Sequence, residues 1–211
     1  MSIKRIAILD YGLGNVRSVS NALRILGANP LVTNDEMTIM QSSGLIIPGV
    51  GAFPQAMMNL SNMGLKDVIQ SYIKTGRPVL GICLGMQLLF EKSYEFGITD
   101  GLGLIPGQVE LIPILSSEGR LPHIKWSNIM PSNDSRQAMF NKLSDNEMRF
   151  YFVHSYAATG VLPENIAATV AYLHHNIIAA VQHENIWGTQ FHPEKSGRSG
   201  LRLIKNFINK C

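Results

Sequence analysis

The sequence predicts an α/β fold, a three-layer sandwich around a central mixed, mostly parallel sheet. Two observations lead to this prediction. In the first half of the chain, short and almost entirely apolar runs alternate with segments of helical periodicity, as parallel strands buried on both faces do. In the second half, short runs separated by turn residues follow one another, which is typical of antiparallel or mixed strands.

The helix predicted over residues 16–26 illustrates the first pattern, because Val16, Val19, Leu23 and Leu26 recur at helical spacing and Gly27 follows as a C-cap. By the same reasoning, we expect strands at 5–9, 31–33, 44–47 and 78–82, and helices at 65–74 and 86–91. The second half predicts strands at 109–114, 151–153, 167–173, 177–182 and 187–191, and a closing amphipathic helix at 202–208. The polar region 116–146 is expected to hold loops and short elements.

Length and composition narrow the class of protein. The length of 211 residues favours a single domain, 1–211. A composition of 45% hydrophobic and 16% charged residues excludes a disordered chain and a fibrous repeat protein. The net charge is only +3 and the basic residues are scattered, which argues against nucleic acid as a partner. No apolar run is long enough for a signal peptide or a membrane span. We expect a cytoplasmic protein whose two cysteines, Cys83 and Cys211, are reduced.

Cys83 stands in the segment Gly81-Ile82-Cys83-Leu84-Gly85, where an apolar strand meets a predicted helix. Such a turn bends its central residue sharply and projects the side chain away from the sheet, and glycines avoid clashes in the bend. A helix N-terminus favours the thiolate, and the Leu84 N–H is available to a developing oxyanion. The pattern predicts a nucleophile; the alternative is a small buried cysteine beside ordinary turn glycines.

A nucleophilic cysteine needs a base and a group that orients the base. His192-Pro193-Glu194 supplies both, because residues two apart on an extended segment point to the same face. A carboxylate there holds the imidazole in one tautomer and stabilises its protonated form. Pro193 indicates a strand end, where sites in open α/β sheets lie. The alternative is a loop with a surface carboxylate.

Pro48-Gly49-Val50-Gly51 also follows an apolar strand directly. Its glycines let a peptide group approach a substrate closely, which suits the second donor of an oxyanion hole. A plain type II turn is the alternative interpretation.

The motif Gly81-Ile82-Cys83-Leu84-Gly85-Met86-Gln87, followed by His192-Pro193-Glu194, resembles that of the class I (triad-type) glutamine amidotransferases. Further matching stretches at 10–15, 48–53, 101–107, 154–156 and 190–197 extend the resemblance over essentially the whole chain. The resemblance implies an enzyme that hydrolyses glutamine to glutamate and ammonia. In it, Cys83 forms a glutamyl thioester, His192 transfers protons and Glu194 orients His192.

The resemblance also implies the rest of the site. It assigns the oxyanion hole to the amides of Gly49, Val50 and Leu84. The positions that match glutamine-binding positions of the family are Gly51, Gln87, Glu95, His154, Ser155 and Tyr156.

The additional stretches resemble most the family members that work in histidine biosynthesis as a heterodimer with a (β/α)8-barrel cyclase subunit. The implied partner receives the ammonia, sheltered from water, and makes imidazole glycerol phosphate and AICAR. One alternative is a paralogue that feeds ammonia to a related barrel enzyme for amidino-group synthesis on a surface-sugar precursor. A second alternative is a non-catalytic subunit that organises a partner, and the intact triad argues against it. A third is a stand-alone cysteine hydrolase, and the additional matching stretches argue against it.

One stretch departs from the family pattern. Where the family has His-x-Gly-Trp-Asn, this chain has His123-Ile124-Lys125-Trp126-Ser127, in a region that lies toward the synthase interface in the family. The departures therefore bear on partner contacts rather than on the triad. We expect no cofactor and no metal. The segment 12–14 lacks the third glycine of a dinucleotide motif, and the histidines at 174, 175 and 183 have no Cys or carboxylate cluster beside them.

Overall fold

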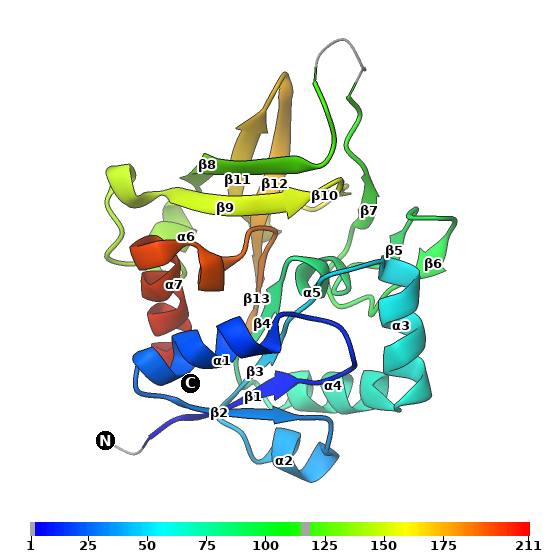
Figure 1. The fold of residues 1–211 in the computed structure, drawn as a ribbon, viewed down its shortest axis with the longest axis vertical. Coiled ribbons are helices and arrows are strands. Elements are labelled where there is room, and N and C mark those ends of the chain that lie inside the picture. Colours follow the sequence, from blue (N-terminus) through cyan, green and yellow to red (C-terminus); the bar gives the residue numbers. More distant parts are fainter. Residues whose placement is uncertain (1–2, 115–118) are drawn as a thin grey trace.

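A computed structural model describes residues 3–114 and 119–211. Within them, nine strands form a main sheet in the order β2-β1-β3-β4-β13-β12-β11-β8-β9, and four form a smaller sheet in the order β10-β7-β5-β6 (Figure 1). The main sheet consists of β1 Arg5–Leu9, β2 Asn29–Thr33, β3 Gly44–Ile47, β4 Val79–Ile82, β8 His123–Pro131, β9 Arg149–His154, β11 Ile166–Tyr172, β12 His175–His183 and β13 Ile186–Thr189. The smaller sheet consists of β5 Lys92–Ser93, β6 Thr99–Asp100, β7 Gln108–Leu111 and β10 Tyr156–Thr159.

The helices connect and cover these strands. They are α1 Val16–Ile25, α2 Glu36–Met40, α3 Phe53–Asn62, α4 Leu65–Lys74, α5 Leu84–Gln87, α6 Asn133–Gln137 and α7 Gly197–Lys210. Single 3-10 turns lie at η1 Asp145–Glu147, η2 Pro163–Asn165 and η3 Pro193–Lys195. Helix α1 begins where the side chain of Asn15 accepts a hydrogen bond from the Ser18 N–H at 3.4 Å, which satisfies one of the unpaired donors of its first turn.

The main sheet separates two apolar cores. Successive residues of a strand point to opposite faces, so Ile6 and Ile8 of β1 pack with α1 and α7, whereas Ala7 and Leu9 pack with α2, α3 and α4. Figure 1 shows α1 and α7 together on one side of the sheet and α3 and α4 on the other. The predicted three-layer sandwich is confirmed.

The direction of the strands changes along the main sheet. From β2 through β1, β3 and β4 to β13, neighbouring strands are parallel, and from β13 through β12, β11 and β8 to β9 they are antiparallel. The parallel strands are the ones buried on both faces, as their continuous apolar runs indicate. The mixed sheet expected from the change of pattern between the two halves is therefore confirmed.

Several predicted elements differ from the structure. The helix predicted at 86–91 has the wrong bounds, since α5 covers Leu84–Gln87. It ends there because the carbonyls of Leu88 and Leu89 accept from the N–H groups of Leu102 and Leu104 at 2.9 and 2.8 Å instead of continuing a helix. The region 116–146, expected to lack long elements, contains the nine-residue strand β8; its residues 116–118 lie outside the described part. Helices α2 and α3 and most of the smaller sheet are also absent from the prediction.

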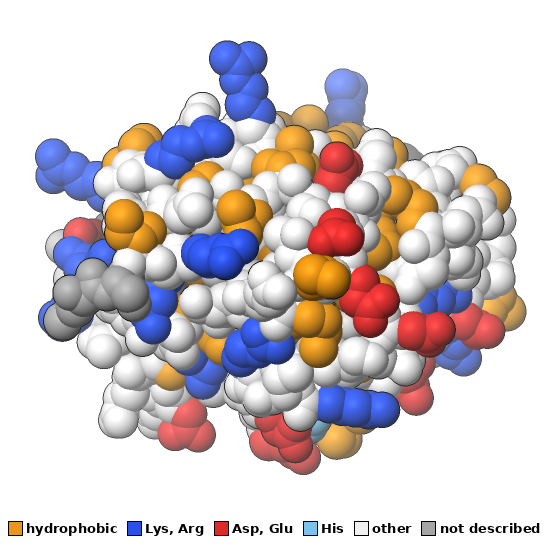
Figure 2. All heavy atoms as spheres, turned by 90° about the horizontal axis from the view of Figure 1, so that it is seen from below, with side chains coloured by type: hydrophobic (Ala, Val, Ile, Leu, Met, Phe, Trp, Pro, Cys, Tyr) orange, Lys and Arg blue, Asp and Glu red, His pale blue; other side chains and the backbone are white. Residues whose placement is uncertain are grey.

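The surface carries charges of both signs. Figure 2 shows Lys and Arg side chains, acidic side chains and single apolar ones mixed across the face seen from below, in agreement with the scattered basic residues of the sequence. Among the helices that the structure describes, none combines the length and the apolar character that a bilayer crossing requires.

Candidate active site

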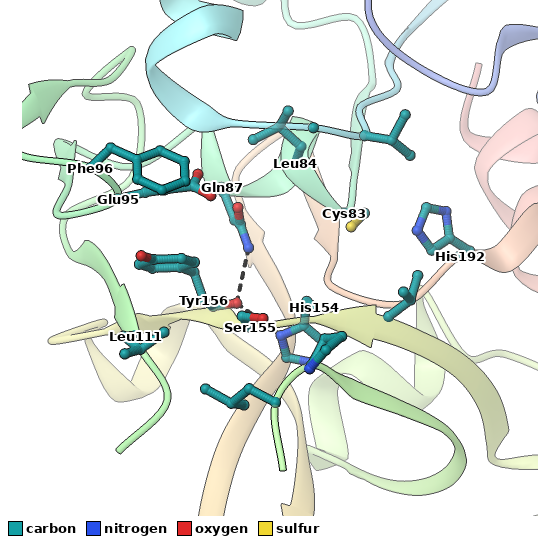
Figure 3. Close-up of a pocket in the computed structure, with 15 residues that line it drawn as sticks. Cys83, Leu84, Gln87, Glu95, Phe96, Leu111, His154, Ser155, Tyr156 and His192 are labelled. Carbon is teal, nitrogen blue, oxygen red and sulfur yellow. Dashed lines mark hydrogen bonds between the residues drawn. The ribbon is translucent and has the colours of Figure 1, made fainter. Parts of the chain in front are cut away.

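A pocket of about 560 Å³ lies where three neighbouring parallel strands of the main sheet end. Val50 follows β3, Cys83 follows β4 and His192 follows β13, so the strand order β3-β4-β13 brings together three segments that are far apart in the sequence. The pocket is lined by Val50, Gly51, Cys83, Leu84, Gln87, Glu95, Phe96, Leu111, Leu121, Pro122, Val153, His154, Ser155, Tyr156 and His192 (Figure 3).

Cys83 occupies the sharp turn that the sequence predicts. Its backbone has φ 54° and ψ −111°, a conformation rare for a residue with a side chain, and its N–H donates to the Thr189 carbonyl at 2.7 Å. A Cβ on Gly85 would collide with the Ile47 carbonyl, and one on Gly81 would lie 2.6 Å from the Gly85 carbonyl. The flanking glycines are therefore required by the packing of the turn.

The first turn of α5 leaves the Leu84 N–H without a helical partner, because the first amides of any helix have none. Helix α5 has only four residues, so its dipole is weaker than that of the longer helix predicted here. The turn therefore acts on the site beside the Cys83 sulfur mainly through one positioned N–H donor, and only weakly through the electrostatic field of the helix dipole.

His192 and Glu194 form a buried pair. Their Nδ1 and Oε1 atoms are 2.8 Å apart, and the two side chains are 2% and 1% exposed. The segment is not extended as expected, because Pro193–Lys195 is the 3-10 turn η3, yet the turn also brings the carboxylate to the imidazole. The N–H of His192 donates to the Tyr151 carbonyl at 3.0 Å, which fixes the residue just beyond β13.

The imidazole of His192 faces the sulfur of Cys83 (Figure 3). Burial by itself lowers the pKa of His192, but the sulfur of Cys83 and the carboxylate of Glu194 outweigh burial and raise this pKa well above its ordinary value. Within the described residues, neither Nε2 of His192 nor Oε2 of Glu194 has a hydrogen-bond partner of ordinary geometry. The arrangement therefore favours a protonated imidazole that faces the sulfur of Cys83, with Nε2 directed to a reacting group.

The Pro48–Gly51 turn forms the opposite wall. The buried hydroxyl of Tyr11 donates to the Pro48 carbonyl at 2.6 Å, and burial raises the pKa of Tyr11, so this donor keeps its proton. Val50 and Gly51 line the pocket, and Gly51 adopts φ 111°. Gly49 packs against α5 instead: a Cβ there would lie 2.7 Å from the Leu84 Cβ. The turn is thus held by the hydrogen bond at Pro48, and Val50 is its first residue to line the pocket.

The residues that the resemblance assigns to glutamine binding lie together. Gln87, Glu95, His154, Ser155 and Tyr156 all line the pocket. The amide nitrogen of Gln87 donates to the Tyr156 carbonyl and to Gln190 Oε1, each at 3.0 Å, which uses both of its hydrogens and leaves its own oxygen as an acceptor.

Glu95 has a second contact that the sequence does not indicate. One carboxylate oxygen accepts the N–H of Phe53, the first residue of α3, at 2.7 Å. The Glu95 side chain therefore connects the pocket with the helix that directly follows the Pro48–Gly51 turn.

Sequence reasoning assigned no role to Gln190. This buried side chain donates to the Cys83 sulfur at 3.7 Å and links that sulfur to Gln87. The available signals are its place two residues before His192 and within the matching stretch 190–197, and neither indicates a contact with the Cys83 sulfur. The exposed Phe96, with φ 56°, also lines the pocket and has no sequence signal.

Comparison with known proteins agrees with this geometry. Residues 7–211 match the family model described as glutamine amidotransferase class-I. The chain belongs to this family. Among its members, the imidazole glycerol phosphate synthase subunit HisH of Methanosarcina barkeri is 44% identical over 209 residues, which cover 99% of this chain and 100% of the relative. The HisH subunit of Lacticaseibacillus casei is 48% identical, over 96% of this chain and 94% of the relative.

Solved structures support the class I amidotransferase fold. The structure of PurLQS from Thermotoga maritima matches with a TM-score of 0.74 at 20% identity, over 99% of both chains. At that identity, the match bears on the fold alone.

Proposed function

We propose that this protein is the glutaminase subunit of an imidazole glycerol phosphate synthase. The proposal rests mainly on one observation: Cys83, held at a strained strand–helix turn, faces the buried His192–Glu194 pair at the end of a pocket. The HisH relatives, at 43–48% identity over almost the full chain, support the choice of synthase.

In the first step, the Cys83 thiolate attacks the side-chain amide carbon of glutamine, and the carbonyl oxygen becomes an oxyanion. The Leu84 N–H and an N–H of the Gly49–Val50 turn stabilise this charge. The tetrahedral intermediate then collapses: the carbon–nitrogen bond breaks, the imidazolium of His192 gives its proton to the nitrogen, and ammonia leaves a glutamyl thioester.

In the second step, water hydrolyses the thioester. Neutral His192 takes a proton from the water as it attacks, the same oxyanion donors act again, and the bond to the Cys83 sulfur breaks to release glutamate. Glu194 keeps Nδ1 of His192 protonated, so that Nε2 is the nitrogen that exchanges protons in both steps.

The pocket suits an α-amino acid. The Gln87 side-chain oxygen and the Glu95 carboxylate are acceptors for an ammonium group, and backbone at Gly51 and the segment 154–156 complete the walls. This supports the assignment of Gly51, Gln87, Glu95, His154, Ser155 and Tyr156 to glutamine binding.

We propose further that the partner is a (β/α)8-barrel cyclase subunit, bound as a heterodimer. It takes up the ammonia without release to water and forms imidazole glycerol phosphate and AICAR. The HisH relatives, each named as one subunit of this synthase, support a partner of this kind.

The experiment is a synthase assay of the full chain mixed with its cognate cyclase. Cys83→Ala is expected to abolish synthesis from glutamine, because no other side chain at the turn can form the thioester, and to leave synthesis from an added ammonium salt intact. Cys211→Ala is the matched control, since this second cysteine lies at the C-terminal end of α7, and both activities should survive. Glutamine turnover by Cys83→Ala would contradict the assignment of the nucleophile, and absence of synthesis by the wild-type mixture from either nitrogen source would contradict the choice of synthase.

A further inference from the structure

Two buried histidines lie behind the candidate glutamine pocket. His123 of β8 and His154 of β9 are paired across the two antiparallel strands, and His123 Nδ1 is 3.1 Å from His154 Nε2. His154 lines the pocket, whereas His123 is completely buried behind it. The mechanism above does not use His123.

The protons of this pair can be assigned from the hydrogen bonds. His154 Nδ1 lies 2.8 Å from the Tyr156 carbonyl, which can only accept, so Nδ1 carries the proton. Burial lowers the pKa of His154 to about 3, so the ring is neutral and Nε2 is an acceptor. His123 Nδ1 must therefore donate to it.

The same reasoning extends one residue further. Burial, assisted by Lys125, lowers the pKa of His123 to about 4, so this ring is neutral as well and its Nε2 accepts. Its partner, at 3.0 Å, is the Ser127 hydroxyl, which must then donate. Ser127, His123, His154 and the Tyr156 carbonyl thus form one chain in which every hydrogen bond points toward the pocket.

The ring of His123 is also fixed in its plane. It stacks between Phe152 and Tyr172, with ring centroids 4.9 and 4.1 Å away and interplanar angles of 19° and 27°. Stacking on both faces holds the plane of the ring, and the contacts of its two nitrogens with His154 and Ser127 fix its rotation within that plane. If the Ser127 donor is lost, His123 still donates from Nδ1 to His154, but its Nε2 becomes a buried acceptor without a donor and the ring loses one of the two contacts that fix its rotation within the plane.

We propose that Ser127 and His123 are positioning residues of the glutamine pocket, which act by fixing the orientation of His154 and, through it, the Tyr156 carbonyl. That carbonyl also holds the amide of Gln87 at 3.0 Å (Figure 3), so the chain orients two side chains on the substrate side of the pocket. The link to glutamine rests on the proposed function, whereas the direction of the hydrogen bonds does not.

The first test reads the tautomers directly. Long-range ¹H–¹⁵N correlation spectra of the labelled full chain at neutral pH are expected to show both His123 and His154 protonated on Nδ1 alone. In Ser127→Ala, His123 should stay protonated on Nδ1, because His154 still accepts that proton, but the ¹⁵N resonance of its Nε2 should move as the lone pair loses its donor, and Ser127→Thr, which restores a hydroxyl, should return it. Wild-type His123 protonated on Nε2, or an Nε2 resonance that is the same with and without the serine hydroxyl, would overturn the chain.

The second test measures glutamine hydrolysis. Ser127→Ala is expected to raise KM for glutamine about 3–10-fold, which corresponds to the free energy of one hydrogen bond that orients the binding residues. The kcat value should stay within about twofold, and Ser127→Thr should restore KM. The matched control is Ser135→Ala, which removes another buried hydroxyl. This hydroxyl donates to the Ala167 carbonyl at 2.6 Å and does not line the pocket, so KM should be unchanged. An equal rise of KM in both alanine variants, or none in Ser127→Ala, would overturn the positioning role.

The two tests separate the possible failures. If the wild-type chain hydrolyses no glutamine with its cognate cyclase, the proposed function fails, and the tautomers still decide whether the chain of hydrogen bonds exists. If glutamine is hydrolysed but the tautomers differ from those assigned, only the inference drawn here fails.

Discussion

Mild acid should destabilise this protein through its two buried histidines. His123 is fully buried and His154 is 6% exposed, and their pKa values in the fold are about 4 and about 3. An imidazole in the unfolded chain has a pKa of about 6.5. At pH 5 both of these imidazoles carry a proton in the unfolded chain and neither does in the folded protein, so stability decreases as the pH falls from 7 to 5.

The magnitude follows from linkage. A pKa that is lower in the fold contributes stability that is present above the unfolded value and is lost as the pH falls below it. At pH 5 the distance to the unfolded pKa is about 1.5 units, which corresponds to about 2 kcal/mol for each histidine at 1.36 kcal/mol per unit. Because both folded values lie below pH 5, the result does not depend on how far below they lie. His123 and His154 together should therefore account for about 4 kcal/mol.

The assay is urea unfolding at pH 7 and at pH 5, with the free energy of unfolding extrapolated to water. His123→Phe keeps a ring between Phe152 and Tyr172 but cannot bind a proton. Its loss of stability between the two pH values should be smaller than that of the wild type by about 2 kcal/mol. His174→Asn, at an exposed histidine, is the matched control and should behave like the wild type. Equal losses in the wild type and His123→Phe would refute the reasoning.

Two further substitutions test the two walls of the pocket. Glu194→Gln removes the carboxylate that stabilises the imidazolium of His192, so kcat/KM for glutamine should fall by about 10³–10⁴-fold and the alkaline limb of the residual pH–rate profile should move to lower pH. An alkaline limb that stays in place would contradict the assigned pair. Tyr11→Phe leaves the buried Pro48 carbonyl without its donor and should lower the free energy of unfolding in urea by about 1–3 kcal/mol, whereas an unchanged unfolding midpoint would contradict that contact.

The parallel half of the sheet could be predicted almost to the residue. Strands β1 and β3 and helix α4 have the predicted bounds, because strands buried on both faces leave an unbroken apolar run that polar turns delimit. Strand β8 could not be predicted in this way. Only part of its length is buried, and Lys125 and Asn128 are exposed within it. That it pairs with β9 and β11 is recognisable only from the register of the folded sheet.

The same distinction applies to the site. The turn at Cys83 is fixed locally by its glycines, so its backbone follows from the sequence nearby. The proximity of His192 and Glu194 follows from their spacing, although the segment is the 3-10 turn η3 and not extended. The contacts of Gln190 and His123 depend on pairing between segments 107 and 31 residues apart, and no local pattern records that pairing. Helix α5 was overestimated for the same reason, since the segment that ends it comes from residues 102–105.

The topology also explains why the predicted variants should differ in what they change. Cys83 and His192 follow strands of the parallel half, where β4 and β13 are adjacent and buried, so the distance between nucleophile and base is set by the sheet itself. The segment 154–156 lies instead between β9 of the antiparallel half and β10 of the smaller sheet, and it reaches the pocket through side-chain hydrogen bonds. A substitution at Cys83 or His192, or at Glu194 beside them, alters the reacting atoms and should change kcat, as with Glu194→Gln.

A substitution that disturbs the segment 154–156 alters how glutamine is bound and should change KM, as with Ser127→Ala. Because Gln190 and Gln87 connect the Cys83 sulfur to the Tyr156 carbonyl, the two groups of residues share one hydrogen-bond network, and the two effects should depart from additivity when both changes are combined.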